Sequence, residues 1–107
     1  MNRAGSILVL CLLAGVRDLH AQDADPRAGR LIAQEVCASC HAVEAGQDRS
    51  PRPQAPPFDR IAGVPGMTTT ALTVALRTSH ETMPNIMLGD RELQDVTAYI
   101  TGLRQRP

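Results

Sequence analysis

Apolar residues first gather in one short stretch near the start of the chain. The segment 4–16 is almost entirely apolar, follows a start that contains Arg3, and is followed five residues later by the small residue Ala21. A basic start, a short apolar run and a small residue are the layout of a secretory signal peptide. The run has 13 residues, whereas a membrane-spanning helix needs about 20. We therefore expect residues 1–21 to be a signal peptide for export to the periplasm, and residues 22–107 to be a single domain with no membrane span after cleavage.

Further along the chain, apolar positions recur at helical spacing in three places. The three stripes are formed by Leu31, Ile32 and Val36, by Leu72, Ala75 and Leu76, and by Leu93, Val96, Ile100 and Leu103. Residues that cap helices stand before each stripe: Asp25-Pro26 before the first, Thr68 or Thr69 before the second, and Gly89-Asp90 before the third. The pattern predicts three helices, the first of which runs into Cys37.

The segment 42–57 interrupts this helical pattern. It contains four of the eight prolines of the chain and is predicted to be a loop. Phe58 to Ala62 is expected to form one further helical turn, ended by Gly63. No stretch shows the sustained alternation that is typical of a strand. The expected fold class is therefore all-α, with three to four short helices and long loops.

Composition limits the partners and the size of the core. Residues 22–107 contain nine Arg, no Lys and ten Asp plus Glu, which gives a formal charge of −1. This balance argues against nucleic acid and against an anionic membrane surface as partners. Only Phe58 and Tyr99 are aromatic. A domain of this size has a marginal hydrophobic core, which a large, flat, apolar cofactor would complete.

The segment Cys37-Ala38-Ser39-Cys40-His41 supplies the chemistry for such a cofactor. Two thiols three residues apart at the end of a helix can form thioethers with the two vinyl groups of one porphyrin edge, and the adjacent His can then ligate the iron. With three Cys and three His in 107 residues, chance would place this motif in about 0.2 percent of such chains. We predict one haem c, bound covalently through Cys37 and Cys40, with His41 as a metal ligand.

Two other uses of these residues are less favoured. A zinc site needs four ligands, and beyond residue 21 the Cys and His residues are Cys37, Cys40, His41 and His80, whose spacing fits no common zinc pattern. A thioredoxin-like dithiol would follow a strand and begin a helix. Here the two cysteines follow a predicted helix.

The second axial ligand of the iron has four candidates, which are Met67, Met83, Met87 and His80. Pro84 disfavours the helical conformation for Met83 and favours an extended backbone, which can cross the open face of a haem. We therefore predict Met83 as the ligand. Met87 is the runner-up, Met67 is expected to serve packing, and His80 would give a bis-histidine iron of lower potential.

These motifs, together with HETMPNIMLGDRELQDVTAYITGLR at residues 80–104, resemble a small bacterial class I cytochrome c over residues 26–104. The resemblance implies a helical fold around one haem, in which the N- and C-terminal helices cross. It also implies that Cys37 and Cys40 form the thioethers, that His41 is the proximal ligand, and that Met83 is the distal ligand.

The same resemblance assigns roles to residues away from the iron. Gly29 is expected where the two helices cross, with Tyr99 packed there, whereas Ala33 stands where many members have an aromatic residue. Either Pro56 or Pro57 is expected to offer its carbonyl to the ring of His41.

We expect an electron carrier rather than an enzyme, a monomer that passes single electrons between redox partner proteins. Because Lys is absent and the charge is balanced, electron transfer should depend only weakly on salt. One alternative is a haem subunit of a periplasmic dehydrogenase or oxidase complex. Another is a gas-binding or peroxide-active haem protein with a labile distal ligand.

Overall fold

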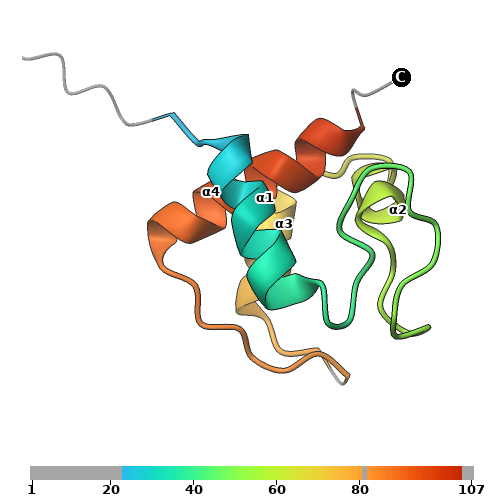
Figure 1. The fold of residues 1–107 in the computed structure, drawn as a ribbon. Helices are drawn as coiled ribbons and strands as arrows, with labels where there is room; N and C mark the ends of the chain where they lie inside the picture. The colour runs from blue at the N-terminus through green and yellow to red at the C-terminus, as the bar shows by residue number, and fades with distance from the viewer. Residues whose placement is uncertain (1–22, 81, 105–107) are drawn as a thin grey trace, which may run out of the picture.

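The computed structural model describes residues 23–80 and 82–104, and within them the chain is helical without a β-strand (Figure 1). The elements are α1 (Pro26–Ile32), the π-helical segment η1 (Ala33–Cys37), α2 (Phe58–Ala62), α3 (Thr69–Arg77) and α4 (Asp90–Leu103). The predicted all-α fold class is confirmed. The predicted signal peptide lies outside the described residues.

Helix α1 begins where the sequence indicates and ends differently. The Asp25 carboxylate accepts a hydrogen bond from the Arg27 amide at 2.9 Å, and Pro26 is the first helical residue. The last turn widens into η1, where the Ala38 amide donates to the Ala33 carbonyl at 3.0 Å. Leu31 is 65% exposed whereas Ala33 is completely buried. The predicted stripe is therefore wrong at Leu31.

Helix α4 forms the centre of the core. Its N-terminus is capped by Glu92, whose carboxylate accepts from the Gly89 amide at 2.8 Å. The predicted apolar face is confirmed, because Leu93, Val96, Ile100 and Leu103 are all buried and Tyr99 is buried beside them.

Helices α1 and α4 cross, as Figure 1 shows, and Gly29 lies at their contact. A Cβ atom at Gly29 would lie 2.0 Å from the carbonyl oxygen of Asp95 and 2.9 Å from Cβ of Tyr99. Only glycine permits this approach of two backbones. Ala33 and Tyr99 belong to the same buried cluster, so the small side chain of Ala33 is surrounded by core residues. The expected crossing at Gly29 and Tyr99 is confirmed.

The two shorter helices complete the fold. Helix α2 is the predicted turn and ends at Gly63. Helix α3 is capped by Thr68, whose hydroxyl accepts from the Ala71 amide at 3.1 Å, and this decides between the two threonines. Helix α3 buries Leu72 against the core.

Candidate haem-attachment site

The turn after η1 brings three of the predicted site residues together. The Cys37 carbonyl accepts hydrogen bonds from the amides of Cys40, at 3.1 Å, and His41, at 2.9 Å. Both cysteines are half-buried free thiols. The π-helical turn therefore places two unpaired sulfurs and one imidazole on a single tight turn at the end of a helix.

The environment of Cys37 keeps its sulfur in the thiol form. Burial, with a smaller contribution from the Cys40 thiol beside it, raises the pKa of Cys37 to about 11. Burial therefore favours the neutral thiol of Cys37 over the thiolate.

The imidazole of His41 is held in one orientation. Its Nδ1 lies 2.7 Å from the carbonyl oxygen of Pro56, which decides between the two candidate prolines. A carbonyl can only accept, so Nδ1 carries the proton and Nε2 of the neutral ring is bare. A bare ring nitrogen opposite a hydrogen-bonded one is the arrangement of a metal-ligating histidine. The ring of Phe58 lies 5.4 Å from the imidazole, centroid to centroid.

Closure of the 42–57 loop positions the Pro56 carbonyl. The Phe58 amide donates to the Ala42 carbonyl at 2.9 Å, and the Arg52 amide donates to the Cys40 carbonyl at 3.1 Å. The Ala42 amide in turn donates to the hydroxyl of Ser50 at 3.0 Å. Because these bonds close the loop immediately after His41, they return Pro56 to the imidazole.

Side chains from α1, η1 and α4 hold the next two residues of that loop. The Tyr99 hydroxyl donates to the buried Val43 carbonyl at 2.6 Å. The Glu44 carboxylate accepts from Gln34 at 2.5 Å and from Arg30 at 2.9 Å. The Gln34 hydrogen bond and the Arg30 guanidinium lower the pKa of Glu44 below its usual value, although partial burial opposes them. Sequence reasoning missed Glu44, since a lone acidic residue in a loop carries no signal.

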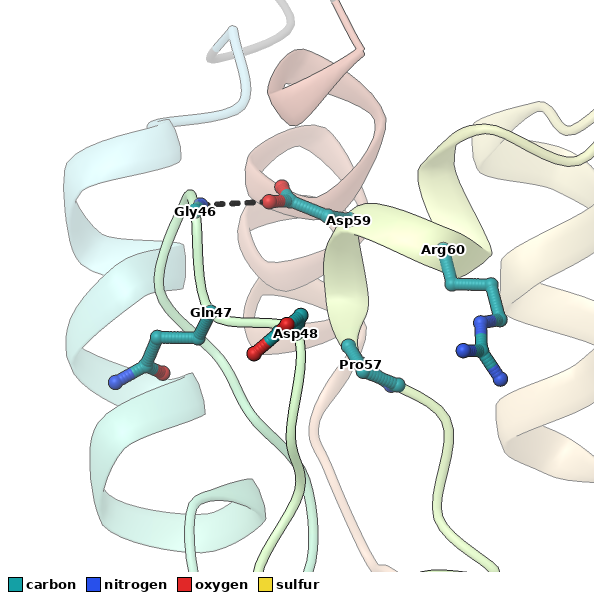
Figure 2. Close-up of a pocket in the computed structure, with 6 residues that line it drawn as sticks. All are labelled: Gly46, Gln47, Asp48, Pro57, Asp59 and Arg60. Carbon is teal, nitrogen blue, oxygen red and sulfur yellow. Dashed lines mark hydrogen bonds between the residues drawn. The ribbon is translucent and has the colours of Figure 1, made fainter.

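A pocket of about 190 Å³ marks the contact between the same loop and α2 (Figure 2). The Asp59 carboxylate accepts from the Gly46 amide at 2.6 Å, and Gly46 has a φ of 80°, which favours glycine. Arg60 points away from this bond in Figure 2. The described residues contain no group of three or more His, Cys, Asp or Glu suited to a metal ion.

Met83 lies in the 78–89 loop between α3 and α4, which Figure 1 places at the same end of the molecule as the end of η1. Met83 is half-buried, and its amide donates to the His80 carbonyl at 3.3 Å. His80 is exposed, Met87 is 91% exposed and Met67 packs against the core. Within the described residues no contact joins Met83 to His41, so its role as a ligand stays a prediction.

The surroundings fit a flat apolar group. Several half-buried apolar side chains pack against the core, contributed by Ile32, Ala38, Ile61, Met67, Leu76 and Leu88. With two free thiols, a bare imidazole nitrogen and these apolar side chains, the residues present suit a covalently held haem. None of the described helices is long and apolar enough to cross a membrane.

Comparison with known proteins gives one match. A family model described as cytochrome C oxidase, cbb3-type, subunit III matches residues 24–100, which span α1 to most of α4. No curated protein and no solved structure matches significantly.

Proposed function

The chain belongs to the family of cytochrome c oxidase, cbb3-type, subunit III, and on that premise we propose that it is a periplasmic mono-haem electron carrier with iron held by His41 and Met83. Membership of a cytochrome c family means that the chain carries haem c covalently, through the cysteines Cys37 and Cys40, and has a haem-based role in electron transfer. Such a role requires redox partner proteins.

The observation that carries the proposal is the 2.7 Å hydrogen bond from Nδ1 of His41 to the Pro56 carbonyl. It fixes the tautomer in which Nε2 can donate to a metal, and it makes the imidazole a stronger electron donor. When bound, haem c supplies an iron that alternates between the ferrous and ferric states. The chain contributes by holding its ligands still, so that little rearranges when an electron moves.

Met83 is proposed as the second ligand because of the proline that follows it and its place in the loop. Pro84 disfavours a helical Met83, and the residue lies in a loop with a half-buried side chain. A thioether ligand would raise the potential above that of a bis-histidine haem. Met87 and His80 are less suited, because both are more exposed than Met83.

An absorption spectrum with a redox titration tests haem, ligation and role together. We expect the bands of haem c, a positive pyridine haemochrome test and a single one-electron transition. Carbon monoxide should not change the spectrum of the reduced protein. A carbon monoxide shift would instead support the gas-binding or peroxide-active alternative, and absence of haem bands would refute the proposal.

Replacement of Met83 identifies the sulfur ligand. Met83→Ala should abolish the weak red-end absorption band that reports sulfur–iron ligation, while the matched variant Met87→Ala should keep it. Loss of the band in Met87→Ala alone would transfer the role to Met87. Export is tested separately: mass spectrometry of the periplasmic protein should find an N-terminus at Gln22, and retention of residues 1–21 would contradict the proposed processing.

The family description favours a second candidate, a haem subunit docked in an oxidase complex. Met87 and Val64 are exposed apolar residues that a permanent partner could cover. Native size separates the candidates. A carrier should migrate as a free protein below the 11.5 kDa of the full chain, because residues 1–21 are removed, whereas a subunit should migrate with oxidase activity.

A further inference from the structure

Three cross-links of decreasing span close the 78–89 loop. At its base, Arg77 at the end of α3 forms an ion pair with Asp90 at the start of α4. Further in, the Ser79 hydroxyl donates to the side-chain carbonyl oxygen of Asn85 at 3.0 Å. Near the tip, the Met83 amide donates to the His80 carbonyl at 3.3 Å. The first two pairs flank Met83 in the sequence, and the third includes its own amide.

We propose that the Ser79–Asn85 hydrogen bond is a clasp that keeps Met83 in place for iron ligation, so that Ser79 and Asn85 are positioning residues. The inference rests on the proposed function, in which Met83 is the distal ligand. The clasp joins a residue four positions before Met83 to one two positions after it. Opening it would release the segment before Pro84 from its side-chain tie to the segment after it.

The other two cross-links are poorer restraints. The Arg77 and Asp90 side chains are 57% and 86% exposed, and ion pairs this exposed contribute little and are weakened by salt. The bond from the Met83 amide is 3.3 Å long, longer than a good N–H···O bond. The clasp is also exposed, but it is uncharged and 3.0 Å long, so it is the shorter of the two inner bonds and is not screened by salt.

The arms of the loop differ in how firmly they are held. Leu88 packs against the core close to the start of α4, and Pro84 has a fixed φ angle. We call the segment from Thr78 to Pro84 the first arm and the segment after Pro84 the second arm. The Thr78 hydroxyl donates to the Val74 carbonyl at 2.7 Å. Among the described residues, the clasp is the only side-chain bond that joins the first arm to the second. The first arm is therefore the one that the clasp restrains.

Binding of imidazole to the ferric holo-protein measures how readily the distal ligand leaves. Ser79→Ala and Asn85→Ala should each raise the imidazole affinity about 2- to 10-fold, the effect of one net hydrogen bond. The double variant should exceed neither single variant appreciably, because both remove the same bond. Ser79→Thr, which retains the hydroxyl, should stay within about twofold of the unmodified protein.

A matched control separates the clasp from general loosening. Thr70 is exposed on α3, and its hydroxyl forms no hydrogen bond with another described residue. Thr70→Ala should leave the imidazole affinity unchanged, and the denaturation midpoint of Ser79→Ala should stay close to that of Thr70→Ala. The clasp is overturned if Ser79→Ala leaves the affinity unchanged, if Thr70→Ala raises it equally, or if the effects of Ser79→Ala and Asn85→Ala multiply.

The red-end absorption band distinguishes the two proposals. If the unmodified protein shows the band and Ser79→Ala has unchanged imidazole affinity, the clasp fails and the function stands. If the unmodified protein lacks the band, Met83 is not the ligand, and the proposed ligation and the clasp fail together.

Discussion

The crossing of α1 and α4 gives the sharpest test of the fold. Gly29→Ala would place a methyl group 2.0 Å from the Asp95 carbonyl oxygen and 2.5 Å from its carbonyl carbon. Both are backbone atoms of α4, so no rotamer change relieves the clash. The helices must separate by more than 1 Å to reach an ordinary contact of about 3.4 Å. Such a shift would disturb the buried cluster to which Ala33 and Tyr99 belong.

The expected cost follows from two opposing effects. Overpacking of a core contact costs about 1–3 kcal/mol and occasionally more, and a clash with backbone belongs at the upper end. Alanine in place of glycine within a helix returns up to about 1 kcal/mol. We expect a net loss of about 2 kcal/mol, which for a domain this small lowers Tm by roughly 8–16 °C.

Thermal unfolding of the holo-protein, followed by far-UV circular dichroism, measures this loss. Gly102→Ala is the matched control, because Gly102 also lies within a helix and its Cβ would meet no atom within 4 Å. That variant should be as stable as the unmodified protein or more stable. If Gly29→Ala unfolds at the same temperature as Gly102→Ala, the close approach inferred for Gly29 is wrong.

Three further substitutions test the supports of the site. Tyr99→Phe leaves the buried Val43 carbonyl without its 2.6 Å bond, which should cost about 1–3 kcal/mol; an unchanged urea midpoint would contradict this. The lowered pKa of Glu44 implies stabilisation that is complete above its usual pKa of 4.5 and is lost as the pH falls below it. Glu44→Gln should therefore be the less stable protein at pH 7, with a difference that shrinks in acid; a constant difference in urea midpoints between pH 7 and pH 3 would refute the linkage. Cys37→Ala/Cys40→Ala should carry no covalent haem and lose helical circular dichroism, because the core is small; full retention of the helical signal would show that the polypeptide core suffices.

The helix boundaries were predicted correctly where the residues at the boundary themselves begin or end the helix. Asp25-Pro26, Gly63 and Gly89 each occupy a helix boundary in the structure. Caps and prolines act within one turn of the chain, so their signal is complete in a short segment. The apolar face of α4 was also predicted correctly, because apolar residues recur at helical spacing along a helix of 14 residues.

Features that depend on long-range contacts were not predictable in the same way. The short stripe on α1 suggested a buried Leu31, yet the crossing at Gly29 turns this residue outward, and η1 changes the register before Cys37. Pro56 and Pro57 are adjacent and chemically identical, so only loop closure decides which carbonyl meets His41. Glu44 acts through partners 10 and 14 residues away.

The two segments that carry the proposed iron ligands are held by different kinds of hydrogen bond. The proximal histidine is held by a loop that backbone hydrogen bonds close and that the buried Tyr99 hydroxyl anchors. The 78–89 loop relies on exposed side-chain bonds. Segments held by exposed bonds open at lower free energy than buried ones. With Met83 as the proposed second ligand, ligand exchange should therefore begin in the 78–89 loop while His41 keeps its place. This loop would then decide whether the haem carries electrons or binds external ligands.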